Sequence, residues 1–221
     1  MPRPRVLMLL YFLVSVADLW LIYSQHAYAR WFTKPLLMPL LLTIVWMSKS
    51  NIPLYKWMLA GLSLSWAGDV LLQLKGMFIP GLASFLAAHI WYIIYFIKIN
   101  PAQTGLLKKE PLIGLPVLVY ILIFLWQLYP FLDTLRMPVT AYAITIGCML
   151  LMSIHAQHKV NKTASVLFFN GALQFVISDS LLAVNLFAFS HTVLSICVMA
   201  TFAGAQYLLV KGSLAVQNTA S

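Results

Sequence analysis

Three aspartates lie within long apolar runs of this sequence, where charged side chains are rare. Its 221 residues include only five acidic ones, and apolar runs contain Asp18, Asp69 and Asp179. An ionisable group inside a membrane span costs at least about 2.5 kcal/mol unless it faces a partner or a polar cavity. Carboxyl groups held in apolar surroundings can act as general acids or bases. These aspartates are therefore the first candidates for catalysis.

Further polar and aromatic residues recur at helical spacing around the aspartates. Residues three or four positions apart project from the same face of a helix. The sets are Ser65, Asp69 and Gln73; Phe85, His89, Tyr92 and Phe96; and Gln174, Ser178 and Asn185, with Asp179 rotated by about 100° from Ser178. We expect these faces to line one polar chamber between helices.

Each polar residue also has a purely structural interpretation. Polar side chains in membrane bundles often form only interhelical hydrogen bonds, worth about 0.6–2 kcal/mol. That interpretation applies to Ser65, Gln73, Gln174 and Gln206. Asp18 could form a structural ion pair with Lys34, whereas too few cations remain nearby for Asp69 and Asp179. His89 is either a core histidine that bonds across helices or a catalytic or ligand-binding group.

The elements that must position these residues are membrane-spanning helices. The chain is 62% hydrophobic and only 9% charged, whereas soluble proteins carry about 25% charged residues. Its mean hydropathy is +0.90. Eight apolar segments are predicted, at about 5–23, 35–48, 54–74, 78–97, 111–129, 138–156, 163–186 and 191–210. Spans of about 20 residues leave only short loops, so we expect residues 1–221 to form a single all-α integral membrane domain.

The basic residues predict the orientation of this bundle. The N-terminal side and the even-numbered loops hold ten of the 14 Lys and Arg residues, and the opposite side holds four. The ten are Arg3, Arg5, Lys49, Lys56, Lys98, Lys108, Lys109, Lys159, Lys162 and Lys211; the four are Arg30, Lys34, Lys75 and Arg136. Cytoplasmic loops carry such an excess, so both termini are predicted to be cytoplasmic. The three aspartates then share the outer third of the membrane, in a chamber open to the outer face.

Other totals exclude whole classes of function. The formal net charge of +9 does not indicate nucleic-acid binding, because the basic residues form no groove-sized patch. Cys148 and Cys197 both lie in apolar runs, so neither a disulfide framework nor a zinc site is expected.

Taken in order, several short motifs resemble the YhhN family of lysoplasmalogenases. They are Lys34-Pro35-Leu36, Gly68-Asp69 with Leu72, Phe85-x3-His89-x2-Tyr92-x3-Phe96, Ser178-Asp179-Ser180-Leu181-Leu182-Ala183 and Ala205-Gln206. The resemblance runs from about residue 18 to residue 210. It implies an eight-helix membrane hydrolase that cleaves the vinyl ether bond of lysoplasmenylcholine or lysoplasmenylethanolamine, releasing a fatty aldehyde and a glycerophospho-base.

The resemblance also implies roles for particular residues. Vinyl ether hydrolysis needs one protonated carboxyl and one ionised group, and Asp69 with Asp179 is the expected pair, in an order left open. His89 would shuttle a proton or orient a carboxylate, and Lys34 would bind the substrate phosphate. The expected substrate-binding residues are Lys34, Asp18, Ser65, Tyr92, Ser178 and Asn185, with Phe85 and Phe96 for the alkenyl chain.

Several alternatives stay open at this point. A metal held by the carboxylates and His89 is one, although no HxxxH or HExxH spacing supports it; no cofactor and no protein partner are predicted. The others are a proton-coupled transporter, a non-catalytic lipid-binding protein, and hydrolysis of another lysophospholipid bond. The compact loops favour a bacterial cytoplasmic (inner) membrane.

Overall fold

The computed structural model describes residues 4–216, which form helices and connecting turns without a strand. Arg3, counted above among the basic residues, lies outside this described part, as do residues 1, 2 and 217–221. The long helices are α1 (Pro4–Tyr23), α2 (Ala27–Met47), α3 (Tyr55–Gln73), α4 (Phe78–Lys98), α6 (Leu115–Leu128), α7 (Arg136–His155), α8 (Lys162–Ala183) and α9 (Thr192–Ala215). The short elements are α5 (Leu106–Lys109), the 3₁₀ turns η1 (Pro111–Gly114), η2 (Tyr129–Phe131), η3 (Asp133–Leu135) and η4 (Ala156–His158), and the π-helical turn η5 (Val184–Ala188).

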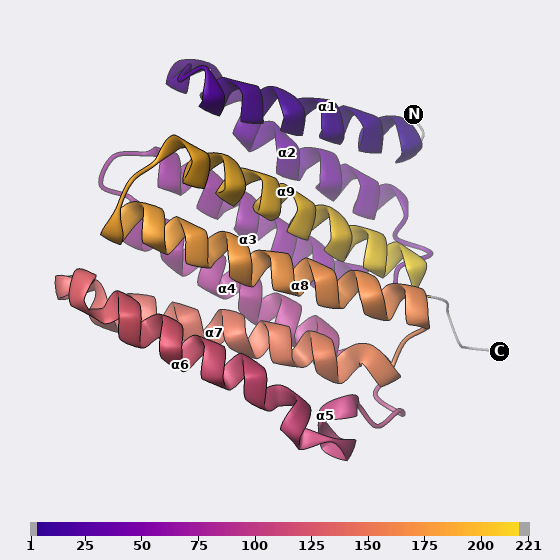
Figure 1. The fold of residues 1–221 in the computed structure, drawn as a ribbon. Helices are drawn as coiled ribbons and strands as arrows, with labels where there is room; N and C mark the ends of the chain where they lie inside the picture. The colour runs from indigo at the N-terminus through magenta and orange to yellow at the C-terminus, as the bar shows by residue number, and fades with distance from the viewer. Residues whose placement is uncertain (1–3, 217–221) are drawn as a thin grey trace.

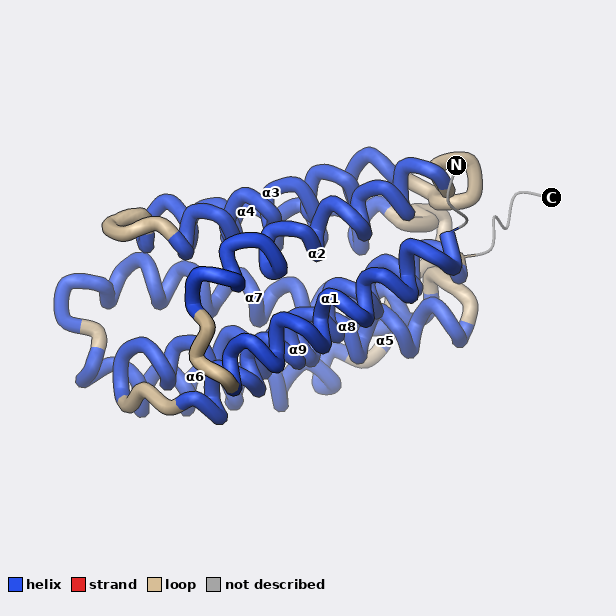
Figure 2. The backbone as a smooth tube through the Cα atoms, turned by 90° about the horizontal axis from the view of Figure 1, so that it is seen from above, coloured by secondary structure: helices blue, strands red, loops and turns tan. Residues whose placement is uncertain are grey.

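The long helices run alongside one another in a single bundle. In Figure 1, α1 and α2 lie along one side, α6 and α7 along the opposite side, and α3, α4, α8 and α9 between them. Figure 2 shows the same helices from above, all extended in one general direction. The beginning of α1 and the end of α9 lie at the same end of the bundle (Figure 1). The connections α1–α2, α3–α4, α6–α7 and α8–α9 therefore lie at the other end.

The second apolar segment differs most from its prediction. It was expected at about 35–48, but α2 begins at Ala27, eight residues earlier, and includes Pro35 and Pro39. Pro39 has no N–H to donate to the carbonyl of Pro35, and the indole Nε1 of Trp66 on α3 donates to that carbonyl instead, at 2.9 Å. A neighbouring helix thus compensates for the proline, as is common in membrane bundles.

Six elements of the described chain are long and apolar enough to cross a membrane. They are Pro4–Tyr23, Phe78–Lys98, Pro111–Phe131, Asp133–His158, Lys162–Ala188 and Thr192–Ala215. Helices α2 and α3 have the length but also carry Arg30, Lys34 and Asp69. The chain is a helical, multi-pass integral membrane protein, as its composition predicted.

The centre of the bundle is a layer of packed aromatic rings. The Phe175 ring of α8 lies edge-on to His89 of α4 and Phe202 of α9, with centroids 5.1 Å and 5.7 Å away. Tyr92 and Phe96 of α4 are fully buried in the same core. These rings fill the interior between α4, α8 and α9.

Candidate active site

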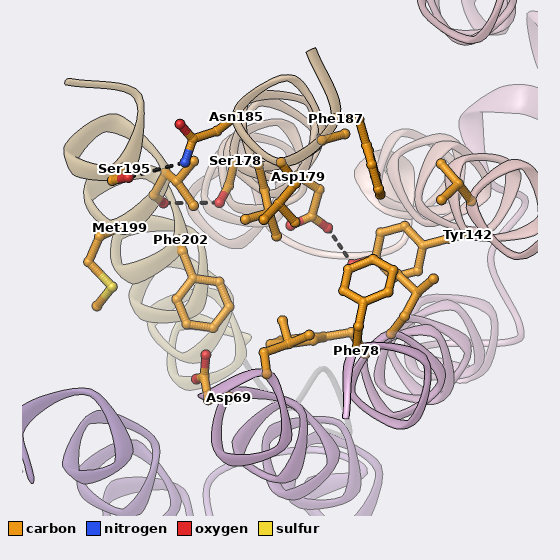
Figure 3. A pocket seen from close by; sticks show the side chains of 18 of the residues that line it. Asp69, Phe78, Tyr142, Ser178, Asp179, Asn185, Phe187, Ser195, Met199 and Phe202 are labelled. Carbon is orange, nitrogen blue, oxygen red and sulfur yellow. Dashed lines mark hydrogen bonds between the residues drawn. The ribbon is translucent and has the colours of Figure 1, made fainter. Parts of the chain in front are cut away.

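A cavity of about 250 Å³ opens between six helices. Its wall includes the beginning of α2 and α4, the end of α8 with η5, and the first turns of α9. It therefore lies toward the end of the bundle that carries the α3–α4 and α8–α9 connections. Figure 3 shows Asp69 and Asp179 on opposite sides of this space, with Phe78, Tyr142 and Phe202 around it. Most of the wall is apolar, so its few polar groups define the chemistry.

Asp69, on α3, forms an ion pair with a lysine from the neighbouring helix. The Nζ of Lys34 on α2 lies 3.1 Å from Asp69 Oδ1. The carboxylate is almost wholly buried, and its Oδ2 accepts no hydrogen bond from any described residue. Asp69 thus has one oxygen held by an ammonium group and one oxygen left to act as an acceptor.

Asp179, on α8, has a different kind of partner. The Tyr142 hydroxyl on α7 donates a hydrogen bond of 2.5 Å to Asp179 Oδ2 (Figure 3). His89 Nε2 lies 4.0 Å from the same oxygen, and His89 is not part of the cavity wall. No lysine or arginine in residues 4–216 lies within ion-pair distance of Asp179. The two cavity carboxyls therefore differ in the charge beside them.

Asp18 forms a second ion pair beside the first one. Arg30 donates from Nε to Asp18 Oδ1 at 3.4 Å and from Nη2 to Oδ2 at 3.3 Å, and Thr33 donates to Oδ1 at 2.6 Å. The interpretation of Asp18 as a partner of Lys34 is therefore wrong, and so is the view that Asp69 lacks a nearby cation. Arg30 and Lys34 are four residues apart on α2, which brings both to one face.

The π-helical turn η5 shapes the cavity mouth. Asn185 donates to Ser195 Oγ at 3.1 Å and accepts from the backbone N–H of His191 at 2.9 Å, which ties α8 to the beginning of α9. Phe187 from the same turn packs edge-on against Phe78 of α4, with ring centroids 5.9 Å apart. Such π-helical turns are frequent at functional sites.

The structure brings together six of the eleven residues predicted for the site. The cavity wall includes Lys34, Asp69, Phe85, Ser178, Asp179 and Asn185. Asp18 and His89 lie behind it and contact wall residues. Ser65, Tyr92 and Phe96 lie deeper: the Tyr92 hydroxyl donates to Gln206 Oε1 at 3.0 Å, and the Phe96 ring packs on Phe168.

Three polar residues of the wall were not predicted from the sequence: Arg30, Tyr142 and Ser195. Arg30 was counted only as a basic residue near the outer surface, because α2 was expected to begin after it. Its position four residues before Lys34 would have placed both on one helical face, had the helix been extended. Tyr142 is a single tyrosine in an apolar run, and nothing in the sequence distinguishes it from a packing residue.

The side chains that could bind a metal ion do not form a metal site in the described chain. Within residues 4–216, no three His, Cys, Asp or Glu side chains come together in a way that could hold a metal ion. Two carboxyls facing one largely apolar cavity, one beside an ammonium and one beside a phenol, are instead suited to proton transfer.

Comparisons with known proteins place the chain in a family. The chain matches the model of the YhhN family over residues 29–213. It is 34% identical over 142 residues to lysoplasmalogenase TMEM86B of Sus scrofa, covering 64% of this chain and 56% of that protein. It is 32% identical over 159 residues to the Mus musculus protein of the same name (72% and 64%), and 27% identical over 164 residues to a lysoplasmalogenase of Mycobacterium tuberculosis (71% and 60%). The match therefore spans less than two thirds of each relative. No solved structure matches the chain.

Proposed function

Because the chain belongs to the YhhN family, we propose that it is an intramembrane hydrolase that cleaves the vinyl ether bond of lysoplasmalogens. The products are a fatty aldehyde and glycerophosphocholine or glycerophosphoethanolamine. The observation that carries this proposal is the pair of carboxyls, Asp69 and Asp179, that face one cavity with unlike partners. The names of the relatives supply the substrate class.

Asp179 is proposed to be the proton donor. A buried carboxylate without a cation is costly. Within residues 4–216, the polar partners of the Asp179 carboxyl are the Tyr142 hydroxyl and His89. Its proton goes to the β-carbon of the vinyl ether, and the positive charge that results is shared between the α-carbon and the ether oxygen. The hydrogen bond from the Tyr142 hydroxyl to Oδ2 then stabilises the ionised carboxylate of Asp179.

Asp69 is proposed to be the ionised partner. Lys34 compensates its charge at Oδ1, and Oδ2 is free to accept a proton from water. Water attacks the α-carbon while Asp69 takes its proton, which gives a hemiacetal. Asp69 then returns that proton to the departing glycerol oxygen, and Asp179 takes the proton of the hemiacetal hydroxyl. Both carboxyls regain their starting states, and no cofactor takes part in these steps.

The remaining wall residues are proposed to hold the substrate. Phe85 and Phe202 provide an apolar surface next to Asp69 for the first carbons of the alkenyl chain. The cavity of about 250 Å³ is slightly smaller than the range of about 300–1,000 Å³ typical of small-ligand pockets. The rest of the chain therefore extends beyond the cavity into the lipid.

The orientation of the site follows from the proposed topology. All eight long helices span the membrane as one domain, both termini are cytoplasmic, and the cavity opens toward the outer leaflet. The bias of ten Lys and Arg residues against four supports this orientation. The membrane is proposed to be a bacterial inner membrane.

Aldehyde release by the purified protein in detergent tests the function. We expect the wild-type chain to release fatty aldehyde from lysoplasmenylcholine, with or without a chelator. Asp69→Asn and Asp179→Asn should each lower the rate by at least about a hundredfold, as expected for loss of an acid or base group. Asp133→Asn is the matched control, since Asp133 is exposed and outside the cavity.

Three outcomes would count against the proposal. Folded Asp69→Asn and Asp179→Asn proteins with full activity would remove these carboxyls from the mechanism. A wild-type protein that binds lysoplasmalogen without releasing aldehyde would be a lipid-binding protein. A proton-coupled transporter would also release no aldehyde. The assay needs no closed compartment, so it detects hydrolysis and not transport.

A further inference from the structure

We propose that Arg30 binds the phosphate of a lysophospholipid headgroup at the cavity mouth, and that Asp18 is its positioning residue. This inference rests on the proposed function and assigns the recognition of the headgroup to a residue other than Lys34. Arg30 belongs to the cavity wall, and 29% of its side chain is exposed. It lies one helical turn before Lys34 on α2, nearer the beginning of the helix and thus the mouth of the cavity.

The guanidinium of Arg30 has one edge engaged and one edge available. Its Nε and Nη2 atoms face the two oxygens of Asp18, at 3.4 Å and 3.3 Å. Arginine carries five N–H donors in a planar fork, and its two edges can each bind a pair of oxygens. Among the described residues, Asp18 is the only side chain that accepts from Arg30. The Nη1–Nη2 edge can therefore bind two oxygens of a phosphodiester.

Asp18 holds this guanidinium in place from behind. Its side chain has no exposed surface, and Thr33 donates a hydrogen bond of 2.6 Å to the same Oδ1 atom that faces Arg30 Nε. A long arginine side chain loses rotational freedom when it binds a ligand. Because Asp18 has already fixed the guanidinium, less of that loss occurs when the phosphate binds.

Lys34 is less suited to the same task because another group already engages it. Its ammonium lies 3.1 Å from Asp69 Oδ1, in a pair that is nearly buried. A phosphate that took Lys34 away would leave Asp69 as a buried charge without a cation, which is strongly unfavourable. Arg30 has no such conflict, because its bond to Asp18 and its bond to phosphate use different edges.

Binding of non-hydrolysable ligands tests this site without any turnover. The ligands are 1-O-alkylglycerophosphocholine, which lacks the vinyl bond, 1-O-alkylglycerol, which lacks the phosphate, and inorganic phosphate. In the full chain, Arg30→Gln should weaken the affinity for the phosphate-bearing ether lipid about tenfold or more. The affinity for 1-O-alkylglycerol should stay within about twofold. Inorganic phosphate should bind far more weakly than the ether lipid.

Two further variants and one control sharpen the test. Arg30→Lys should recover only part of the lost affinity, since lysine supplies charge without the planar fork. Asp18→Asn should also lower the affinity for the phosphate-bearing ether lipid more than the affinity for 1-O-alkylglycerol. Arg136→Gln is the matched control, because Arg136 lies over the Tyr129 ring outside the cavity, with its guanidinium carbon 4.5 Å from the ring centroid.

Several results would overturn this inference. One is unchanged affinity for the phosphate-bearing lipid in Arg30→Gln; another is an equal loss for both lipids, which would indicate a structural role. Inorganic phosphate that binds as tightly as the ether lipid would indicate a site for free anions. These results are distinct from a failure of the proposed function, since a wild-type protein that releases no aldehyde would still give a defined pattern of ligand binding.

Discussion

At the scale of single residues, each buried aspartate has a different kind of partner. Asp69 has an ammonium, Asp18 has a guanidinium and a hydroxyl, and Asp179 has a phenol. All three are carboxyl groups in an apolar bundle, so the partners set their chemical differences. Only Asp69 and Asp179 reach the cavity, and their unlike partners allow one to lose a proton while the other gains one.

Removing the Tyr142 hydroxyl should slow turnover without weakening lipid binding. Tyr142→Phe leaves the ring that packs against His89 but deletes the donor to Asp179 Oδ2. Hydrogen bonds to charged groups are worth about 1.5–3 kcal/mol, so we expect kcat for aldehyde release to fall about tenfold or more, with KM nearly unchanged.

Tyr120→Phe serves as the control for this change. The Tyr120 hydroxyl donates to Ser180 Oγ at 2.8 Å, outside the cavity. That variant should keep the activity of the wild type. If Tyr142→Phe instead raised KM and left kcat intact, Tyr142 would be a substrate-binding residue and would not support the proton donor.

At the scale of elements, the α3–α4 contact fixes one wall of the cavity. Both helices approach closely because α3 presents glycine to aromatic rings of α4. A Cβ atom added at Gly68 would lie 2.6 Å from the Phe85 ring, and one added at Gly61 would lie 2.5 Å from the Tyr92 ring. Small residues allow such close packing between membrane helices. The position of Phe85 in the cavity wall therefore depends on Gly68 of the neighbouring helix α3.

Gly68→Ala should disturb both the helix pair and the cavity. The new methyl group must displace the Phe85 ring, and overpacking of this kind typically costs about 1–3 kcal/mol. We expect a lower melting temperature in detergent and weaker binding of 1-O-alkylglycerol, whose chain would contact that ring. In Gly114→Ala the nearest atom is the end of the Leu151 side chain at 3.1 Å, which is a milder contact away from the cavity. Equal effects of both variants would mean that the α3–α4 contact does not control the wall.

The elements themselves were largely predictable from the sequence. Each predicted apolar segment overlaps one long helix, because hydropathy reports burial in lipid or among helices. The beginning of α2 was not predictable in this way, because Arg30 and Lys34 lower the hydropathy of its first turns. Their charges are compensated by Asp18 and Asp69 from other helices, which no local pattern in α2 reveals.

At the scale of the whole molecule, the sequence indicated that the aspartates lie at one level along the helices, but not which side chains lie beside them. Counting residues along each span placed the three aspartates at one level, and two of them do line one cavity. Which helices pack together could not be predicted from the sequence pattern. The Tyr11 hydroxyl of α1 donates to the carbonyl of Ala203 on α9 at 2.8 Å, across almost the entire chain. For the same reason, Tyr142 and Asp179 could not be paired in advance.

The orientation of the bundle decides which leaflet supplies the substrate, and cysteine labelling in intact bacterial cells can determine it. With Cys148 and Cys197 replaced by serine, single cysteines at exposed positions between the long helices report each side of the membrane. Lys75→Cys and Ser190→Cys lie at the end of the bundle that carries the cavity, and Gln103→Cys and His158→Cys lie at the other end. The end of the bundle that carries Gln103 and His158 has the excess of basic residues, which favours its retention on the cytoplasmic side.

We therefore expect a membrane-impermeant maleimide to label Lys75→Cys and Ser190→Cys in intact cells. Gln103→Cys and His158→Cys should react only after the membrane is opened, which also serves as the control for their accessibility. The reverse pattern would place the cavity toward the cytoplasmic leaflet, so that lysoplasmalogens would enter from inside. Different labelling of Lys75→Cys and Ser190→Cys would mean that fewer than four of the helices between them cross the membrane, which would rule out the eight-span topology.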